Sequence, residues 1–197
     1  MDHDRLEKQL AFFMECDKMK SIYRNTMLAN QSRMETDAEH SWHIALMAML
    51  LQEYAPAGIN CDHTIRMCLV HDLVEIDAGD TFAYDTEGYK DKAEREVKAA
   101  DRLFSLLPAD QCKEFRTLWE EFEACQTPDA LFANCCDRFQ PVLNNIATNG
   151  HSWAQHHIRR EQVEKRLSPI QQAMPQLWPY CTKLLDTAVE KGWLTAE

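Results

Sequence analysis

Apolar residues recur every three or four positions along most of this chain, a spacing that places them on one face of an α-helix. Runs in which Val, Ile or Thr alternate with polar residues, as in a half-buried strand, are scarce. We therefore expect an all-α fold. The pattern predicts helices over residues 4–20, 36–54, 62–80, 91–107, 108–125 and 127–149, then two more helical segments with breaks at Ser168-Pro169 and Pro175.

Short local signals predict where some of these helices begin and end. Thr36 and Glu39 have the spacing of a capping box, which starts a helix. Gly79 suits the end of the 62–80 helix, and residues 81–90, which lack an apolar period, predict a loop over a pocket. Pro141 lies inside the 127–149 helix and predicts a kink beside Asp137.

Length, charge and cysteine usage narrow the class of protein. The 197 residues fit one domain, and the net charge of −11 argues against nucleic acid or an anionic membrane as partner, because both need a basic patch. No apolar run is long enough to cross a bilayer, and the acidic start at Met1–Asp4 is unlike a signal sequence. Eight cysteines without C-x-x-C spacing predict reduced thiols. We expect a cytoplasmic protein with a small-molecule ligand.

Candidate chemistry lies where charged residues enter apolar stretches. His71, Asp72 and Glu75 lie in the most apolar part of the 62–80 helix, between Leu69-Val70 and Leu73-Val74. A His-Asp pair is also common by chance on a solvated helix. Buried charges, however, must be paired or coordinate a metal, so the surroundings favour a metal site with ligands from other segments.

Four further residues have two interpretations each. Asp137 also enters an apolar stretch and is either a metal ligand or the partner of an ordinary salt bridge. His43 fits a satisfied core histidine better than a ligand, one turn after His40. Arg24 and Arg33 are either surface arginines or, near a metal, a phosphate clamp.

The order of these residues resembles the HD-domain metal-dependent phosphohydrolases. The resemblance rests on E-H-S at Glu39–Ser41, L-V-H-D-L-V-E at Leu69–Glu75, G-D at Gly79–Asp80, and L-W-E-E-F-E before C-D at Cys136-Asp137. These motifs are similar to the branch of the bacterial 5′-deoxynucleotidases and human HD domain-containing protein 2. The resemblance implies one HD-type helical bundle, with a motif-bearing core over about residues 20–145 and a helical extension over about 150–197.

The resemblance also implies a ligand set. One divalent metal ion would be held by two imidazoles and two carboxylates, from His40, His71, Asp72 and Asp137. This mixture of donors suits Mn²⁺, Co²⁺, Fe²⁺, Mg²⁺ or Zn²⁺.

By the same resemblance, Glu75 and Asp80 would orient the attacking water and handle protons, and Arg24 would hold the substrate phosphate. Relatives commonly have a tryptophan just after that arginine, whereas Asn25 and Thr26 follow here, which leaves the sugar preference open. The resemblance also implies a homodimer, and the chain has more apolar residues than a single bundle needs, which favours the same prediction.

Other classes share this fold. HD-type diiron oxygenases and two-metal phosphodiesterases need histidines between the HD pair and the last aspartate, and this chain has none between Asp72 and Asp137. A regulatory module would be expected to lack Glu75 or a ligand. The preferred prediction is a 5′-nucleotidase for (deoxy)nucleoside 5′-monophosphates. The alternatives are a metal-binding regulatory module and a phosphatase or phosphodiesterase for another small phosphate ester.

Overall fold

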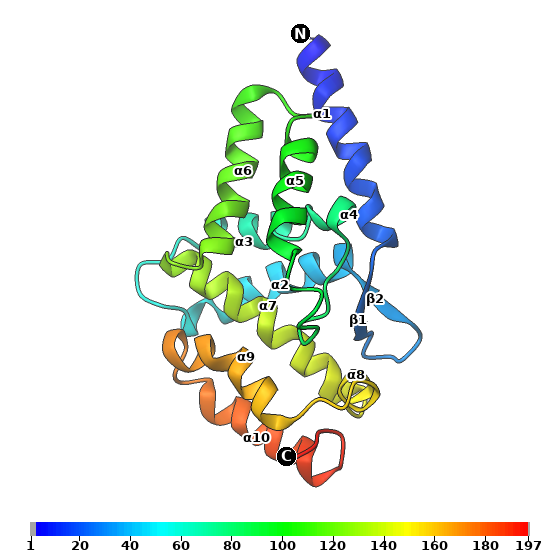
Figure 1. Ribbon diagram of the computed structural model, residues 1–197. Coiled ribbons are helices and arrows are strands. Elements are labelled where there is room, and N and C mark those ends of the chain that lie inside the picture. The colour runs from blue at the N-terminus through cyan, green and yellow to red at the C-terminus, as the bar shows by residue number, and fades with distance from the viewer. Residues whose placement is uncertain (1–2, 197) are drawn as a thin grey trace.

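A computed structural model describes residues 3–196, so Met1 and Asp2 of the acidic start lie outside the described residues. The predicted all-α class is confirmed, with one two-stranded sheet in addition (Figure 1). The α-helices are α1 (His3–Cys16), α2 (Asp37–Leu51), α3 (Cys61–Val70), α4 (Glu75–Ala78), α5 (Lys92–Phe104), α6 (Ala109–Ala124), α7 (Pro128–Ala147), α8 (His151–Gln155), α9 (Arg160–Ala173) and α10 (Trp178–Glu190). Two 3₁₀ helices, η1 (Asp17–Ser21) and η2 (Gln52–Tyr54), and two strands, β1 (Tyr23–Met27) and β2 (Met34–Thr36), complete the described elements.

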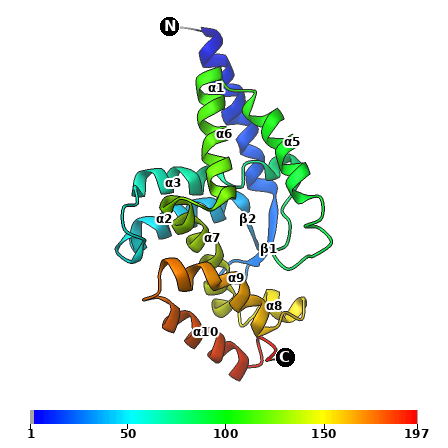
Figure 2. The ribbon, with the colours of Figure 1, turned by 60° about the vertical axis from the view of Figure 1, so that its left-hand side comes forward.

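Helix α7 crosses the middle of the molecule and is packed on several sides. It contacts α2, α3, α6 and α9, and Figure 2 shows α2, α3 and α7 close together. Its interior residues, including Phe132, Ala133 and Cys136, are almost fully buried. Burying each large apolar side chain contributes about 1.5–3 kcal/mol, so the packing around α7 stabilises the fold.

The predicted helix over residues 62–80 is wrong as a single helix, because α3 ends at Val70 and α4 begins at Glu75. Between them, hydrogen bonds reach back three residues, as from Glu75 N to Asp72 O at 2.9 Å. All five residues from His71 to Glu75 are buried. Five consecutive residues point in all directions around such turns, so neighbouring elements must cover this segment on every side.

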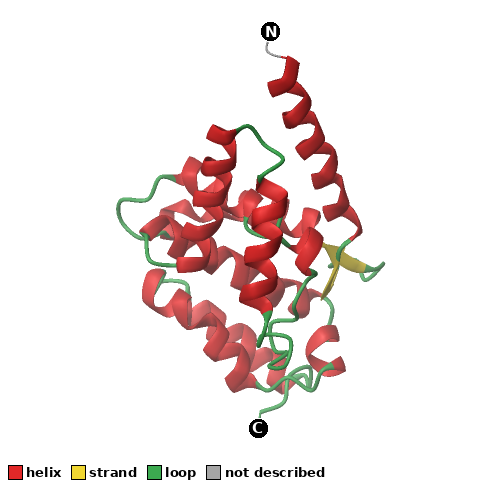
Figure 3. Cartoon of the chain, turned by 45° about the horizontal axis from the view of Figure 1, so that its top comes forward, coloured by secondary structure: helices red, strands yellow, loops and turns green. Residues whose placement is uncertain are grey.

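The sheet was not predicted. Strand β1 pairs antiparallel with β2, in the hairpin drawn in yellow in Figure 3. Its sequence, Y-R-N-T-M, lacks apolar alternation, and its pairing depends on the residues packed around it. The hairpin leads directly into α2, whose capping box at Thr36 and Glu39 is confirmed.

The C-terminal third folds back against α7 through α9 (Figure 1). The predicted break at Ser168-Pro169 is wrong, since α9 continues through Pro169. A proline cannot donate to the carbonyl four residues back, here that of Lys165, and the Ser168 hydroxyl donates to that carbonyl at 2.9 Å instead. The break near Pro175 is present between α9 and α10.

All eight cysteines are free thiols. Among residues 3–196, no helix is both long and apolar enough to cross a membrane.

Candidate metal centre and active site

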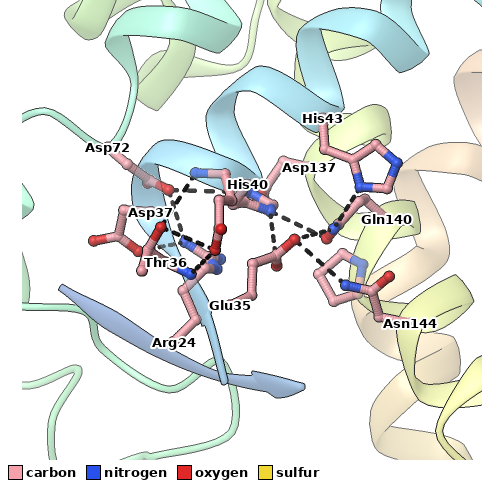
Figure 4. A network of polar contacts seen from close by, with 12 residues as sticks. Arg24, Glu35, Thr36, Asp37, His40, His43, Asp72, Asp137, Gln140 and Asn144 are labelled. Carbon is pink, nitrogen blue, oxygen red and sulfur yellow. Dashed lines mark hydrogen bonds and ion pairs between the residues drawn. The ribbon is translucent and has the colours of Figure 1, made fainter. Parts of the chain in front are cut away.

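His40 lies on the inner face of α2 and is fully buried. Its Nδ1 is 3.1 Å from Gln140 Oε1, and its Nε2 is 3.0 Å from Asp137 Oδ1 (Figure 4). An amide oxygen only accepts, so Nδ1 carries the hydrogen and donates to Gln140. In the neutral ring, Nε2 then presents its lone pair toward Asp137.

His71 follows the last residue of α3, and its ring has the same arrangement as that of His40, with the hydrogen on Nδ1. Its Nδ1 lies 2.8 Å from the Cys68 carbonyl oxygen, so Nδ1 donates there and Nε2 is left for another partner. Nε2 is 3.0 Å from Asp72 Oδ2 but not oriented for a hydrogen bond, and it has no hydrogen-bond partner within residues 3–196. A buried nitrogen of this kind is satisfied by a proton or a metal ion.

The four predicted ligands are brought together. Ligand atoms of His40, His71 and Asp72 lie within 4.8 Å of one another. Asp137 Oδ1 is 3.0 Å from His40 Nε2 and 3.9 Å from His71 Nε2. Two imidazole lone pairs and two carboxylates around one small volume need a cation between them, and this donor set fits a divalent metal ion.

The electrostatics of the cluster agree with that fit. Burial lowers the pKa of His40 to about 4, with the charge of Arg24 acting in the same direction, so the ring is neutral at pH 7. Burial would raise the pKa of Asp72, but the charges of His71 and Arg24 outweigh it and hold the pKa well below its usual range. The charge of Asp72 raises the pKa of His71 against the effect of burial. A metal ion at Nε2 of His71 would compete with a proton for that nitrogen.

Arg24 enters the site from β1 and lies among carboxylates. Its Nη1 is 2.7 Å from Asp72 Oδ2, 3.2 Å from Asp37 Oδ1 and 3.9 Å from Asp80 Oδ1. These charges outweigh the effect of burial and raise the pKa of Arg24 well above its usual value. Its Nε–H is buried without an acceptor among the described residues.

Asp37 was not predicted as a site residue, although it lies within the capping box between Thr36 and Glu39. Asp37 is fully buried, and its carboxylate lies within 4.8 Å of ligand atoms of Asp72 and Glu75. Burial, with the charge of Asp72 in support, raises the pKa of Asp37 to about 7 and that of Glu75 well above its usual value. The available signal was its position three residues before His40, on the same face of α2.

A second missed group lies behind His40 (Figure 4). Gln140 Nε2 donates to Glu35 Oε1 at 2.6 Å and lies 3.1 Å from His43 Nδ1. Asn144 Nδ2 also reaches Glu35 Oε1, at 3.4 Å. Burial raises the pKa of Glu35 to about 7. Gln140 therefore links His40 to a buried acid, and its signal was the spacing of one helical turn from Asp137.

A cavity of about 290 Å³ opens beside this cluster. The loop predicted over residues 81–90 lies within the segment 79–91 between α4 and α5, and it contributes Phe82 and Tyr84 to the cavity lining, to which Trp153 also belongs. Arg95 holds the loop, since its guanidinium donates to Ala78 O and, at 3.1 Å, to both Thr81 Oγ1 and Gly88 O.

Their positions decide the open interpretations of Arg33 and His43, and the structure also shows the ion-pair partner of Asp137. Arg33 lies on the surface and pairs with Glu39. His43 is half-buried, stacks on Trp42 with ring centroids 5.7 Å apart, and contacts Gln140 rather than the metal ligands. Asp137 pairs with Arg166 at 3.5 Å, and the adjacent Arg138 donates elsewhere.

The sequence also matches known proteins. A family model of the HD domain matches residues 16–178, most of the chain. The chain belongs to the HD domain family. This HD domain protein is similar to human 5′-deoxynucleotidase HDDC2, with 33% identity over 62% of this chain and 56% of the human protein. It therefore spans little more than half of that relative. The Dictyostelium discoideum 5′-deoxynucleotidase HDDC2 is 30% identical over 70% of this chain and 76% of its own.

A solved structure supports the same family. A predicted metal-dependent phosphohydrolase from Magnetospirillum magnetotacticum MS-1 superposes with a TM-score of 0.93 at 50% identity. The match covers 98% of this HD domain chain and 97% of the other. The fold around the His/Asp cluster is therefore shared over nearly the whole length, C-terminal helices included.

Proposed function

We propose that this chain is a metal-dependent phosphatase that releases phosphate from nucleoside 5′-monophosphates. The observation that carries the proposal is the convergence of two buried imidazoles and two buried carboxylates beside a cavity that Arg24, Glu75 and Asp80 also line. Similarity to proteins named 5′-deoxynucleotidases supports the substrate class.

One divalent ion would be held by His40, His71, Asp72 and Asp137, and Mn²⁺, Co²⁺, Fe²⁺, Mg²⁺ and Zn²⁺ all suit these donors. Bound there, it would lower the pKa of water and neutralise charge on phosphate oxygens. Arg24 supports a single ion. Its guanidinium already balances the other carboxylates around Asp72, where a second cation would otherwise be needed.

Glu75 and Asp80 would orient the attacking water and move its proton. Burial beside Asp37 and Asp72 makes the Glu75 carboxylate a stronger base than an ordinary glutamate. Burial also raises the pKa of Asp80, against the charge of Arg24. Arg24 would contact the phosphate, because its buried Nε–H requires an acceptor that the described residues do not supply.

The cavity supports a ligand with one anionic end and one aromatic end. The charged cluster lines part of the cavity, and Phe82, Tyr84 and Trp153 are among the other lining residues. Its volume of about 290 Å³ is close to the lower end of small-molecule sites. A nucleobase would pack against these rings while the phosphate faces Arg24.

We also infer a single HD-type domain over 1–197, with a motif-bearing core of about 20–145, that acts in the cytoplasm as a homodimer without nucleic-acid or membrane partners. The net charge of −11 supports the absence of polyanionic partners. The outer face of α2 supports the dimer, because Trp42, Leu46, Met49 and Leu50 form an exposed apolar stripe at helical spacing.

The test is a phosphate-release assay on purified protein with a panel of nucleoside 5′-monophosphates, cyclic nucleotides and triphosphates. We expect turnover of monophosphates that requires added divalent metal and stops with a chelator, with one ion per chain by elemental analysis. Faster turnover of a triphosphate, or two ions within about 4 Å, would exclude this function. Nucleotide binding without phosphate release would instead support the regulatory module.

A further inference from the structure

Four cationic side chains line the cavity, and they differ in how they are paired. Arg24 is 2.7 Å from Asp72, and Lys92 is 2.5 Å from Glu96. Arg138 donates only to neutral oxygens, the Arg166 carbonyl and Asn134 Oδ1, both at 3.3 Å. The fourth is Arg166.

Arg166 comes from α9, in the C-terminal extension, and reaches the metal centre from a different element than Arg24. Its Nη2 lies 3.5 Å from Asp137 Oδ2, and no other carboxylate within residues 3–196 pairs with it. That distance is longer than the 2.7–2.9 Å of a strong charge-assisted hydrogen bond. The guanidinium thus lines the cavity with most of its donor capacity unused, at 25% side-chain exposure.

The charge of the site explains why a second arginine is needed. Asp72, Glu75, Asp80 and Asp137 line the cavity and Asp37 lies close to Asp72 and Glu75, so an incoming phosphate dianion meets a strongly acidic environment. Arg24 is largely committed to three of these carboxylates. Metal binding would draw charge from Asp137 and leave its weakly held Arg166 available.

From this geometry, and resting on the proposed phosphohydrolase function, we propose that Arg166 is a second phosphate-binding residue. Arg24 approaches the phosphate from the side of Asp72 and Arg166 from the side of Asp137. The planar fork of Arg166 matches two phosphate oxygens. The C-terminal extension therefore completes the site, although the motifs that mark the site end at Asp137.

The experiment measures binding of inorganic phosphate to the full chain loaded with one metal ion per site, by titration calorimetry. Arg166→Gln removes the guanidinium, and Lys165→Gln is the matched control, because it makes the same charge change one residue away on the exposed face of α9. Metal affinity is measured separately in phosphate-free buffer. We expect Arg166→Gln to weaken phosphate binding about 10- to 100-fold while metal affinity stays within about twofold.

A phosphate affinity in Arg166→Gln equal to that in Lys165→Gln would overturn the proposal. So would an equal loss of metal affinity, since Arg166 would then only position Asp137, and so would a wild-type protein that binds no phosphate. If Arg166→Gln does not fold, Arg166→Lys decides: it keeps the charge beside Asp137 but lacks the fork, so weaker phosphate binding at unchanged metal affinity is expected, and wild-type phosphate binding would contradict the proposal. Absence of nucleotide turnover would refute only the proposed function, because phosphate binding is read without it.

Discussion

Replacing Gln140 with methionine tests whether the residues behind His40 control metal binding. The side chain of Gln140 is fully buried in α7 and makes three polar contacts, to His40 Nδ1 at 3.1 Å, to Glu35 Oε1 at 2.6 Å and to His43 Nδ1 at 3.1 Å. Methionine has nearly the same length and volume but can neither accept from the His40 imidazole nor donate to Glu35 or His43. The substitution therefore removes all three contacts with little change in packing.

Two effects of different size follow from these contacts. Without an acceptor at Nδ1, His40 is no longer held in the tautomer that leaves Nε2 free, and loss of such a contact weakens metal binding about 10- to 100-fold. Glu35 Oε1 keeps the 3.4 Å contact from Asn144, and His40 Nδ1 is left 3.8 Å from Glu35 Oε2, which is too far for a hydrogen bond. Each buried group left unpaired costs about 1–3 kcal/mol, so we expect the metal-free protein to lose about 2–4 kcal/mol of unfolding free energy.

Metal affinity is measured by competition with a chromogenic chelator, and stability by urea unfolding of the metal-free protein followed by circular dichroism. Asn144→Leu is the control, since it removes a contact to Glu35 but none to His40. It should lower stability and leave metal affinity unchanged. The reasoning is refuted if Gln140→Met binds metal like the wild type, or if Asn144→Leu loses as much metal affinity as Gln140→Met.

Three more outcomes are expected. Asp72→Asn should lose metal and activity. Glu75→Gln should keep its metal, as measured by elemental analysis, while its kcat falls about 10²- to 10⁴-fold. The reverse pattern of metal content would show that the ligands are misassigned. Since burial raises the pKa of Glu35 from 4.5 to about 7, the unfolded chain loses this proton first as pH rises, so the contribution of Glu35 to the unfolding free energy should fall by roughly 2–3 kcal/mol between pH 4.5 and 7. Urea titrations of chelator-treated protein should show this fall as the difference between the pH profiles of wild type and Glu35→Gln, because Asp37 and His40 contribute to both profiles alike, and parallel pH profiles would reject the contribution of Glu35. Arg95→Met should raise KM and speed hydrogen exchange of residues 79–91, because three loop acceptors lose their donor; unchanged exchange would mean that other contacts hold the loop.

Local rules predicted most helices because their signals lie within a few residues. The capping box at Thr36 and Glu39 depends only on neighbours, as does the end of α4 at Gly79, where φ is +75°. The break after Val70 was not predictable in this way. It follows from packing that buries every side chain from His71 to Glu75, and the apolar period alone gave no sign of that packing.

The same limit applies to the site. Asp72 and Asp137 were found because a charge in an apolar stretch is visible in the sequence, and the resemblance joined them to the two histidines. The sequence around Asp37 and Gln140 gives no comparable signal. Their roles depend on which faces of α2 and α7 meet, and that is fixed only when the helices pack together.

The ligand cluster also ties distant parts of the chain together, since His40 and Asp137 are 97 residues apart in the sequence. An ion shared by α2, the turn after α3, and α7 would act as a cross-link, and closing a loop of this length costs an unfolded chain about 4 kcal/mol of entropy. Loss of the ion would therefore raise the unfolded population that proteases remove. Scarcity of the metal would then reduce the number of folded molecules as well as the rate at which each one works.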